Sequence, residues 1–167
     1  MKHFTVSLDK TVLANTIKRL NAYRDSLPEK LRLIQQKLAY LGKVKVETSY
    51  PASDAYAMYQ GDRRYDVGVE PKENGFSIVL SGQAVAFIEF GAGVKYGDGY
   101  PGTKPAGIVP IGQYGKGHGQ RQAWGFYNET NDVEITHGNP PAAVMYKTAQ
   151  ELREAVLMVA REVFAGD

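Results

Sequence analysis

The sequence predicts an α+β protein in which N-terminal and C-terminal helices pack on a mainly antiparallel sheet, with a long loop rich in glycine and tyrosine. Three observations support this fold class. Apolar residues recur at helical spacing near both ends of the chain, and extended segments separated by turn-forming residues lie between them. Ten of the 18 glycines fall between Gly91 and Gly119, which disfavours a regular helix or central strand there.

The first predicted elements are a short strand and a long helical stripe. Residues 4–8 alternate apolar and polar side chains, which predicts a half-buried strand, and Asp9 follows as a helix cap. Apolar residues then recur at alternating spacings of four and three, which is typical of one face of a helix. The members of this stripe are Leu13, Ile17, Leu20, Leu27, Leu31, Ile34, Leu38 and Leu41.

Pro28 interrupts this helical region. A proline disfavours helical geometry at the residue before it, and Ser26 with Glu29 has the spacing of a capping box. We therefore expect two helices, about 10–25 and 28–41, that meet at a bend. A coiled coil is the alternative, but the stripe spans few turns without a break, so a core-facing helical hairpin is preferred.

The middle of the chain predicts a β-hairpin after an irregular connection. Residues 42–57 contain several turn formers and are expected to form a linker or a frayed helix end. Segments 64–70 and 76–81 favour extended structure, and residues 71–75 between them supply turn chemistry.

A second hairpin and a final helix follow the glycine-rich loop. Segments 122–128 and 133–136 are expected to pair, with the turn at 129–132, and residues 137–141 close the hairpin. The last helix is expected over about 142–164. Its apolar face is predicted to contain Met145, Ala149, Leu152, Val156, Val159 and Val163.

Composition limits the class of protein. Hydrophobic residues make up 43% and charged residues 23%, as in a soluble globular protein, and residues 1–167 are expected to form a single domain. No apolar run reaches the roughly 20 residues that span a bilayer, and the first residues lack the apolar core of a signal peptide. We therefore expect a protein made and kept in a cytoplasm, or assembled there. The absence of cysteine excludes disulfides, thiolate catalysis and cysteine-ligated metals.

The charge is divided into alternating blocks. Residues 1–45 carry about +7, residues 46–90 about −4, residues 91–127 about +3 and residues 128–167 about −4. Alternating blocks suit self-association. Nucleic-acid binders usually concentrate stronger positive charge on one face, so the first 45 residues make nucleic-acid binding the less favoured hypothesis.

Glu89 lies inside the apolar run 85–90, next to the start of the glycine-rich segment. A carboxylate there must face water or find a hydrogen-bond partner, because burying it without one is costly. We expect a fixed polar anchor that hydrogen-bonds nearby backbone or loop groups where the core ends.

Motifs for catalysis and cofactor binding are weak. Residues 97–102 match the spacing of a dinucleotide-binding turn, but the prolines at and after it forbid the required helix. Residues 112–117 resemble a phosphate loop without its serine or threonine. A metal site from Glu89, His118 and His137 is a minor hypothesis, since a hydrogen bond from His137 that orders its turn is simpler. We expect no enzymatic activity and no cofactor.

Aromatic and basic residues alternate along the glycine-rich loop. Such residues are enriched in protein–protein contacts, and they also form stacking platforms for single-stranded nucleic acid. A loop this long, with few residues to secure it to its own core, favours ordering against another subunit. The expected subunit-interface residues are Lys95, Tyr96, Tyr100, Tyr114, Lys116, Arg121 and Trp124.

An ordered set of motifs is spread over roughly residues 10–165. The set comprises residues 85–94 (VAFIEFGAGV), 114–117 (YGKG), the Trp124 segment, 136–140 (THGNP), Met145-Tyr146, 151–153 (ELR) and 161–164 (REVF). Together these motifs resemble the tail-completion, or minor tail component, family of long-tailed bacteriophages. The version with the Thr-His-Gly turn resembles members from phages and prophages of Gram-positive bacteria. Residues 42–57 depart from the cleaner second helix of many relatives.

This resemblance implies a non-enzymatic virion protein that completes the head-proximal end of the tail or joins head and tail. It implies a ring, sixfold in the family, around the passage for DNA, with neighbouring tail and head-joining proteins as partners, no membrane, and assembly in the host cytoplasm. The residues carried over are structural and form two turns: Glu89, Phe90, Gly91 and Gly93 before the loop, and His137, Gly138 and Pro140 before the last helix.

Overall fold

The computed structural model describes residues 9–59, 61–93, 96, 99–103, 122–127 and 130–166. The strand predicted over residues 4–8 and most of the predicted assembly loop, 91–121, lie outside these residues. The described elements give an α+β fold, as the sequence predicts. Its strands form two separate two-stranded antiparallel sheets, β1–β2 and β3–β4.

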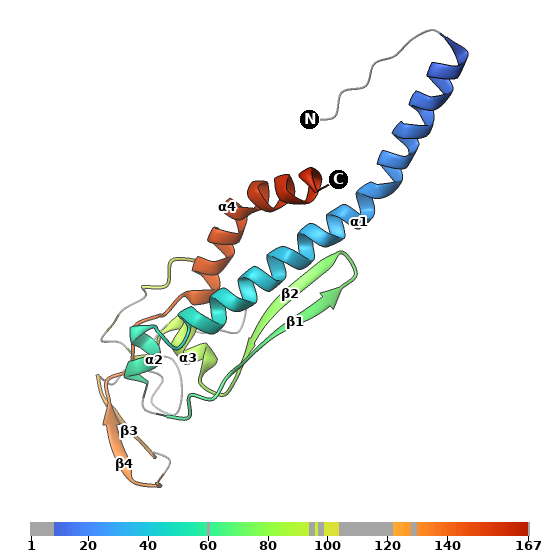
Figure 1. Cartoon of the computed structure of the whole chain (residues 1–167). Coiled ribbons are helices and arrows are strands. Elements are labelled where there is room, and N and C mark those ends of the chain that lie inside the picture. Colours follow the sequence, from blue (N-terminus) through green and yellow to red (C-terminus); the bar gives the residue numbers. More distant parts are fainter. Residues whose placement is uncertain are drawn as a thin grey trace.

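Helix α1, Lys10–Ser49, is one helix, so the prediction of two helices is wrong. Asp9 caps it as predicted, accepting the N–H groups of Thr11 at 2.8 Å and Val12 at 3.1 Å. Pro28 lies inside the helix, where it removes one N–H donor and crowds the preceding turn. Figure 1 shows that the helix axis changes direction between its dark blue first part and the lighter remainder, so the chain bends there without ending the helix.

The capping box predicted at the proline does not form. The hydroxyl of Ser26 instead donates a hydrogen bond to the backbone carbonyl of Tyr23, one turn earlier in the same helix. This bond satisfies the hydroxyl within a continuous helix, so no new N-terminus is needed at Pro28.

Helix α1 also continues beyond Gly42, where a linker or a frayed end was expected. The reason lies in packing, because Gly42 is the point at which α1 passes between β2 and α4. A Cβ atom at this position would meet the ends of the Ile78 and Leu152 side chains. After the helix, Ser53 caps the short helix α2, Asp54–Met58, by accepting the N–H of Tyr56.

The first hairpin consists of β1, Asp66–Lys72, and β2, Gly75–Ser81. Its existence matches the prediction, but the turn is shorter than expected because Pro71 and Lys72 belong to β1. A proline is acceptable here because a two-stranded sheet has only edge strands. Figure 1 shows the hairpin lying along one side of α1, with α4 on the other side. The amide of Gln35 donates to the carbonyl of Asn74 and ties the turn to α1.

The remaining elements are α3, Val85–Phe90, then β3, Trp124–Tyr127, β4, Val133–Thr136, and α4, Val144–Ala165. Strands β3 and β4 pair as predicted. Helix α4 runs antiparallel to α1, since Lys45 pairs with Glu151 near the start of α4 and Lys37 pairs with Glu162 near its end. Of the described helices, none is long and apolar enough to cross a membrane.

The apolar face predicted for the last helix is partly wrong. Val159 and Val163 are buried, but Ala149 and Val156 are exposed. Burial at the start of the helix falls on Val144 and Thr148 instead. The true face is therefore rotated by about one residue in the first turns, because Val144 points into the core beside α3.

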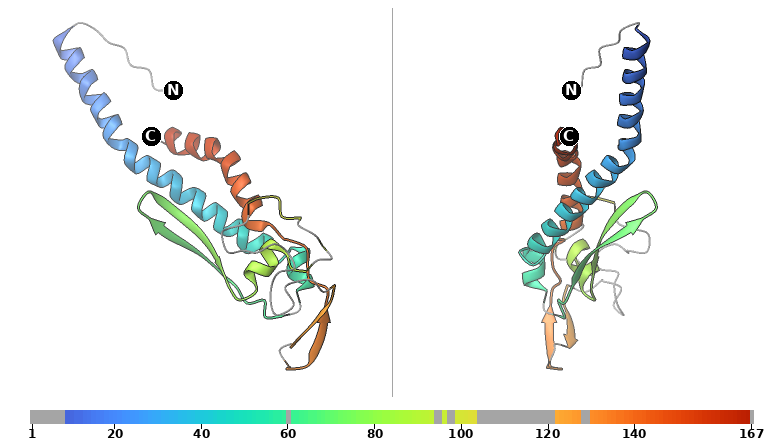
Figure 2. Two further views of the ribbon diagram at one scale, coloured as in Figure 1. Left: turned by 180° about the vertical axis from the view of Figure 1, so that it is seen from behind. Right: turned by 45° about the vertical axis from the view of Figure 1, so that its right-hand side comes forward.

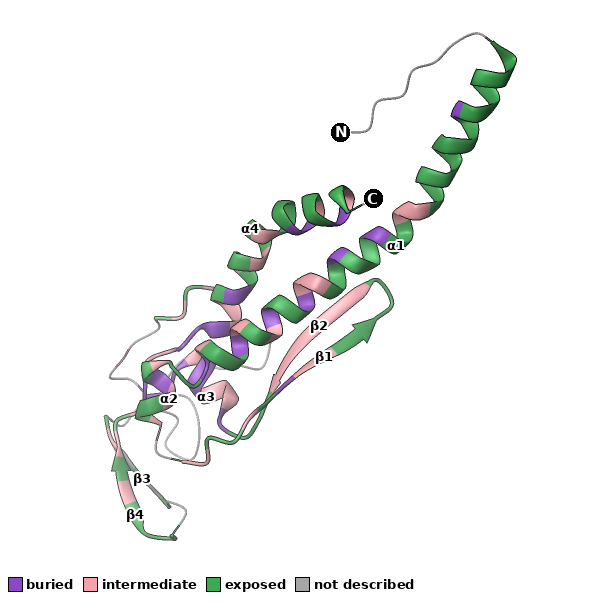
Figure 3. Ribbon diagram, viewed as in Figure 1, coloured by how far each residue is buried: buried purple, intermediate pink, exposed green. Residues whose placement is uncertain are grey.

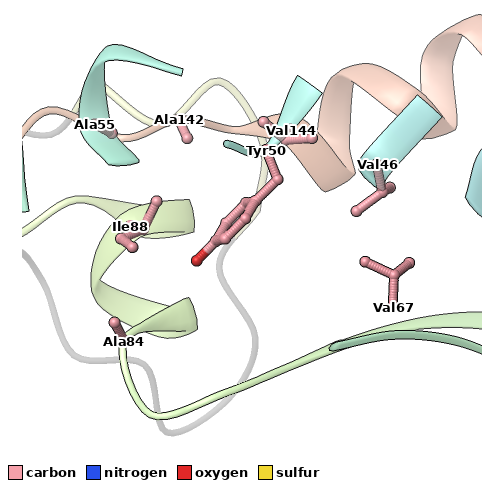
Figure 4. Packing of buried hydrophobic residues seen from close by; sticks show 8 residues of the cluster. All are labelled: Val46, Tyr50, Ala55, Val67, Ala84, Ile88, Ala142 and Val144. Atoms are coloured by element: carbon pink, nitrogen blue, oxygen red, sulfur yellow. The ribbon is translucent and has the colours of Figure 1, made fainter. Parts of the chain in front are cut away.

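The main core lies at the junction of α1, α2, α3, β1 and the start of α4 (Figure 4). Tyr50 and Ile88 are fully buried at its centre. A second, smaller cluster of Ile34, Val159 and Val163 joins α1 to the last turns of α4. Figure 3 shows that burial is concentrated around these clusters, whereas the first part of α1 is almost entirely exposed. The main core contains Val46, Tyr50, Ala55, Val67, Ala84, Ile88, Ala142 and Val144.

Candidate functional site

The carboxylate of Glu89 is buried at the start of α4. Only 2% of Glu89 is exposed, and it comes from the last turn of α3. One oxygen, Oε2, accepts the backbone N–H of Val144 at 2.8 Å, and the other, Oε1, accepts that of Met145 at 3.0 Å. A longer contact of 3.4 Å reaches the N–H of Tyr146. These are backbone hydrogen bonds of the kind that the apolar surroundings of Glu89 predict.

This contact replaces a local helix cap. Ala143, at the N-cap position, has left-handed backbone angles (φ 51°, ψ 36°) and no side chain able to accept a hydrogen bond. The first turn of α4 also contains no acidic residue. The first N–H groups of a helix have no acceptor within the helix and carry partial positive charge, so the anionic side chain of Glu89 satisfies both needs.

Two opposing effects act on the acidity of Glu89. Burial raises the pKa of its carboxyl group and is the larger effect. The three backbone N–H groups and the ammonium group of Lys147 lower that pKa. The carboxylate also affects a neighbour, since burial and then the charge of Glu89 raise the pKa of Tyr100.

Backbone hydrogen bonds reinforce the junction around Glu89. The carbonyl groups of Ile88 and Glu89 accept the N–H groups of Ala142 at 2.8 Å and Ala143 at 3.1 Å. The end of α3 and the segment entering α4 are therefore joined by main-chain and side-chain bonds together. We call this set of contacts the Glu89 junction.

A backbone bridge extends the junction toward the glycine-rich segment. Ala92 and Asn139 exchange both N–H···O bonds, each 3.0 Å long. The buried amide of Asn139 also donates to the carbonyl groups of Phe87 and Pro140. The two turns carried over from the family resemblance thus lie side by side, although almost 50 residues separate them in sequence.

Glycines make the close approach of these turns feasible. Gly91, Gly93 and Gly138 all have φ between 80° and 84°, in the region that side chains disfavour. At Gly138, an added Cβ atom would collide with the backbone carbonyl of Ala92. Glycine at this position is therefore required by both conformation and space.

His137 orders the base of the second hairpin. Its Nδ1 atom lies 2.9 Å from the carbonyl oxygen of Gln122, which joins the residues before β3 and after β4. The described residues contain no group of three histidine or acidic side chains that would hold a metal ion. His118, the third member of the minor metal hypothesis, lies outside them. Both carboxylate oxygens of Glu89 accept backbone N–H groups of α4, so they point at hydrogen-bond donors.

The predicted interface residues are described only in part. Tyr100 is half-buried, with its ring 4.8 Å from that of Phe90 and 6.0 Å from that of Tyr146 between centroids, so it packs against the Glu89 junction. Tyr96 is half-buried and Trp124 begins β3. The structure does not describe the side chain of Trp124, nor residues Lys95, Tyr114, Lys116 and Arg121.

Sequence reasoning missed an exposed apolar face on the first part of α1. Residues 10–27, which we call the α1 arm, extend beyond the end of α4 (Figure 2). Leu13 is 40% exposed, Ile17 50% and Leu20 43%. These residues were expected to face the core. The expected division into two helices hid this feature, since α1 is one helix of 40 residues and α4 has only 22.

A second exposed apolar face lies on the β3–β4 hairpin. The register pairs Tyr127 with Val133 and Gly125 with Ile135, which places their side chains on one face of the ribbon. Tyr127 and Ile135 are each 70% exposed and Val133 is 64% exposed. We call this surface the hairpin face.

Comparison with known proteins adds no relative, since no family model, curated protein or solved structure matches the chain. The polar groups at the centre of the described fold bind backbone N–H and carbonyl groups. Among the described residues, the α1 arm and the hairpin face are exposed apolar surfaces on elements that project from the core.

Proposed function

We propose that this chain is a structural virion protein that completes the head-proximal end of a phage tail or joins head and tail, as an oligomeric ring around the DNA passage. The observation that carries the proposal is the pair of exposed apolar faces on opposite ends of one small core. Large exposed apolar surfaces usually mark contacts with other proteins. Among the described residues of one copy, nothing buries either face, which suits a subunit of an assembly.

The Glu89 junction supports the same proposal. It uses buried polar groups to fix the point at which α3, the glycine-rich segment and α4 meet. A rigid base at this point would hold the 91–121 loop in position against a neighbouring subunit. The motif resemblance adds the setting, a ring of six copies that contacts neighbouring tail and head-joining proteins and admits DNA without reading its sequence.

The test is the composition and structure of the virion. We expect the protein in purified phage particles of its host, and a ring at the head-proximal end of the tail in cryo-electron microscopy. A gene position between head-joining and major tail genes would agree. Absence of the protein from purified virions that package and eject DNA normally would refute the proposal.

Nucleic-acid binding is the second candidate, because the α1 arm carries four exposed basic side chains, those of Lys10, Lys18, Arg19 and Arg24. Binding through phosphate contacts would weaken steeply as salt rises. Retarded migration of DNA or RNA at physiological ionic strength, lost in Lys18→Glu, would support this function. Unchanged migration of every DNA and RNA probe at low salt would exclude it.

A further inference from the structure

Helix α4 is held on the rest of the fold in two separate places. Its first turns belong to the main core and receive the cap from Glu89. Its last turns carry the buried side chains of Val159 and Val163, which pack with Ile34 of α1 in the second cluster. Between Thr148 and Val159, a stretch that the structure describes in full, no residue is buried.

The middle of α4 is open to solvent on most sides. Val156, Leu157 and Met158 follow one another in sequence, and all three are exposed. Successive residues of an α-helix lie about 100° apart, so these three side chains span about 200° of its circumference. In Figure 1 the red last turns of α4 run in a different direction from its first turns. The two ends of the helix therefore meet at a point where packing does little to hold them in line.

A lysine from α1 holds the last turn of α4. Lys30 is buried, and its Nζ atom lies 5.1 Å from the centroid of the Phe164 ring, which is a cation–π contact. Lys37 also pairs with Glu162. Both of these side chains are more than a third exposed, so solvent screens their attraction and Lys30 makes the stronger contact.

The packing around this end of α4 is loose. A surface hollow of about 550 Å³ lies between residues 26–37 of α1 and 162–166 of α4. Side chains beside such a hollow lack neighbours on one side and lose the corresponding van der Waals contacts. Of the described residues, three buried ones form this cluster, whereas eight form the main core. Regions with few buried apolar contacts are those that open locally at low cost in free energy.

We propose that residues 159–165, which we call the α4 latch, open from α1 while the main core and the first turns of α4 stay folded. Lys30 keeps the latch closed through its contact with Phe164. Opening uncovers Ile34, which belongs to the same stripe of α1 as the exposed residues of the α1 arm. The latch thereby sets how far the exposed apolar stripe extends along α1. This inference goes beyond the proposed function, because the latch operates within a single copy.

Native-state hydrogen exchange of the full chain, followed by NMR, tests the latch. After correction for intrinsic rates, we expect the amides of residues 160–164 to exchange at least about tenfold faster than those of residues 148–152, since local opening requires less free energy than global unfolding. Lys30→Ala should accelerate exchange in the latch by a further threefold or more. Lys45→Ala is the matched control, because Lys45 pairs with Glu151 in the first part of α4. It should leave exchange in the latch unchanged.

A variant in the main core separates local opening from global unfolding. Ile88→Val removes one methylene group from a fully buried side chain, so it should accelerate exchange of residues 148–152 about fivefold. The latch amides should not respond, because the main core stays folded when the latch opens. Equal protection along α4, or equal acceleration of both segments by Ile88→Val, would refute the latch. Unchanged latch exchange in Lys30→Ala would refute the role of Lys30.

Discussion

The Glu89 carboxylate accepts the backbone N–H of Val144 at 2.8 Å, so a residue of α3 caps helix α4 from 55 positions away in sequence. This bond couples the end of the first half of the fold to the start of the last helix. The cap forms only when α3 and α4 are both in place. The contribution of Glu89 to stability therefore depends on tertiary structure and not on the local formation of α4.

Replacing Glu89 tests this cap. We expect Glu89→Ala to lower the free energy of unfolding by about 2 to 3 kcal/mol, because it leaves buried N–H groups without an acceptor. Glu89→Gln should cost less, since its amide oxygen still accepts one of the bonds. Urea denaturation measures both. Glu154→Ala, an exposed position on α4, is the matched control. If both Glu89 variants were as stable as the control, the cap would contribute nothing.

The acidity of Glu89 predicts a dependence of stability on pH. Burial raises the pKa of Glu89 above its ordinary value of 4.5. Between the ordinary and the raised pKa, the folded state binds more protons than the unfolded state, so the contribution of Glu89 to stability falls as pH rises. We expect the stability difference between wild type and Glu89→Gln to decrease through this window. Urea titrations at several pH values measure it, and an increase with pH would contradict the shift.

The buried hydroxyl of Tyr50 has no hydrogen-bond partner in the described structure. Burial raises the pKa of this phenol, and the nearby charge of Glu89 raises it further. Tyr50→Phe should therefore raise the free energy of unfolding by about 1 kcal/mol, because it removes an unsatisfied polar group. The edge-on ring contacts with Tyr56 and Tyr65 would remain.

The matched control for this substitution is Tyr40→Phe, at a side chain that is 69% exposed. It should leave the midpoint of thermal unfolding unchanged. A loss of stability in Tyr50→Phe, with none in the control, would mean that the hydroxyl has a partner in the folded protein.

Gly138 should tolerate no side chain. Gly138→Ala forces a disfavoured backbone conformation and a collision with the carbonyl of Ala92, so we expect a loss of about 2 kcal/mol or more. Gly68→Ala in β1 is the control, since an added Cβ atom there meets no heavy atom within 4 Å. Thermal unfolding compares the two. Equal unfolding midpoints for the two variants would show that the backbone around Ala92 and Asn139 can move to accept the added Cβ atom without loss of stability.

The sequence predicts which helices and strands exist better than it predicts where they end and what they contact. Alternating and helical periodicities locate both hairpins and the last helix, because those patterns are local. They fail at Pro28, where strong helix formers on both sides carry α1 through the proline. They fail again at Gly42, where packing between Ile78 and Leu152 favours continuation of the helix.

The candidate site was harder to predict for a physical reason. An apolar run around a carboxylate predicts that Glu89 needs a partner, but nothing local identifies the N–H groups of α4 as that partner. The exposure of Ile17 also has no local signal, since it depends on where α4 ends in space. Both features arise from the relative placement of distant elements, which periodicity does not encode.

The bridge between Ala92 and Asn139 bears on how the fold tolerates insertions. It fixes both ends of residues 93–138 at one point on the core. Doubling the length of a closed loop costs only about 0.6 kcal/mol, so we expect an insertion between these two ends to destabilise the core less than an insertion within α1 or α4.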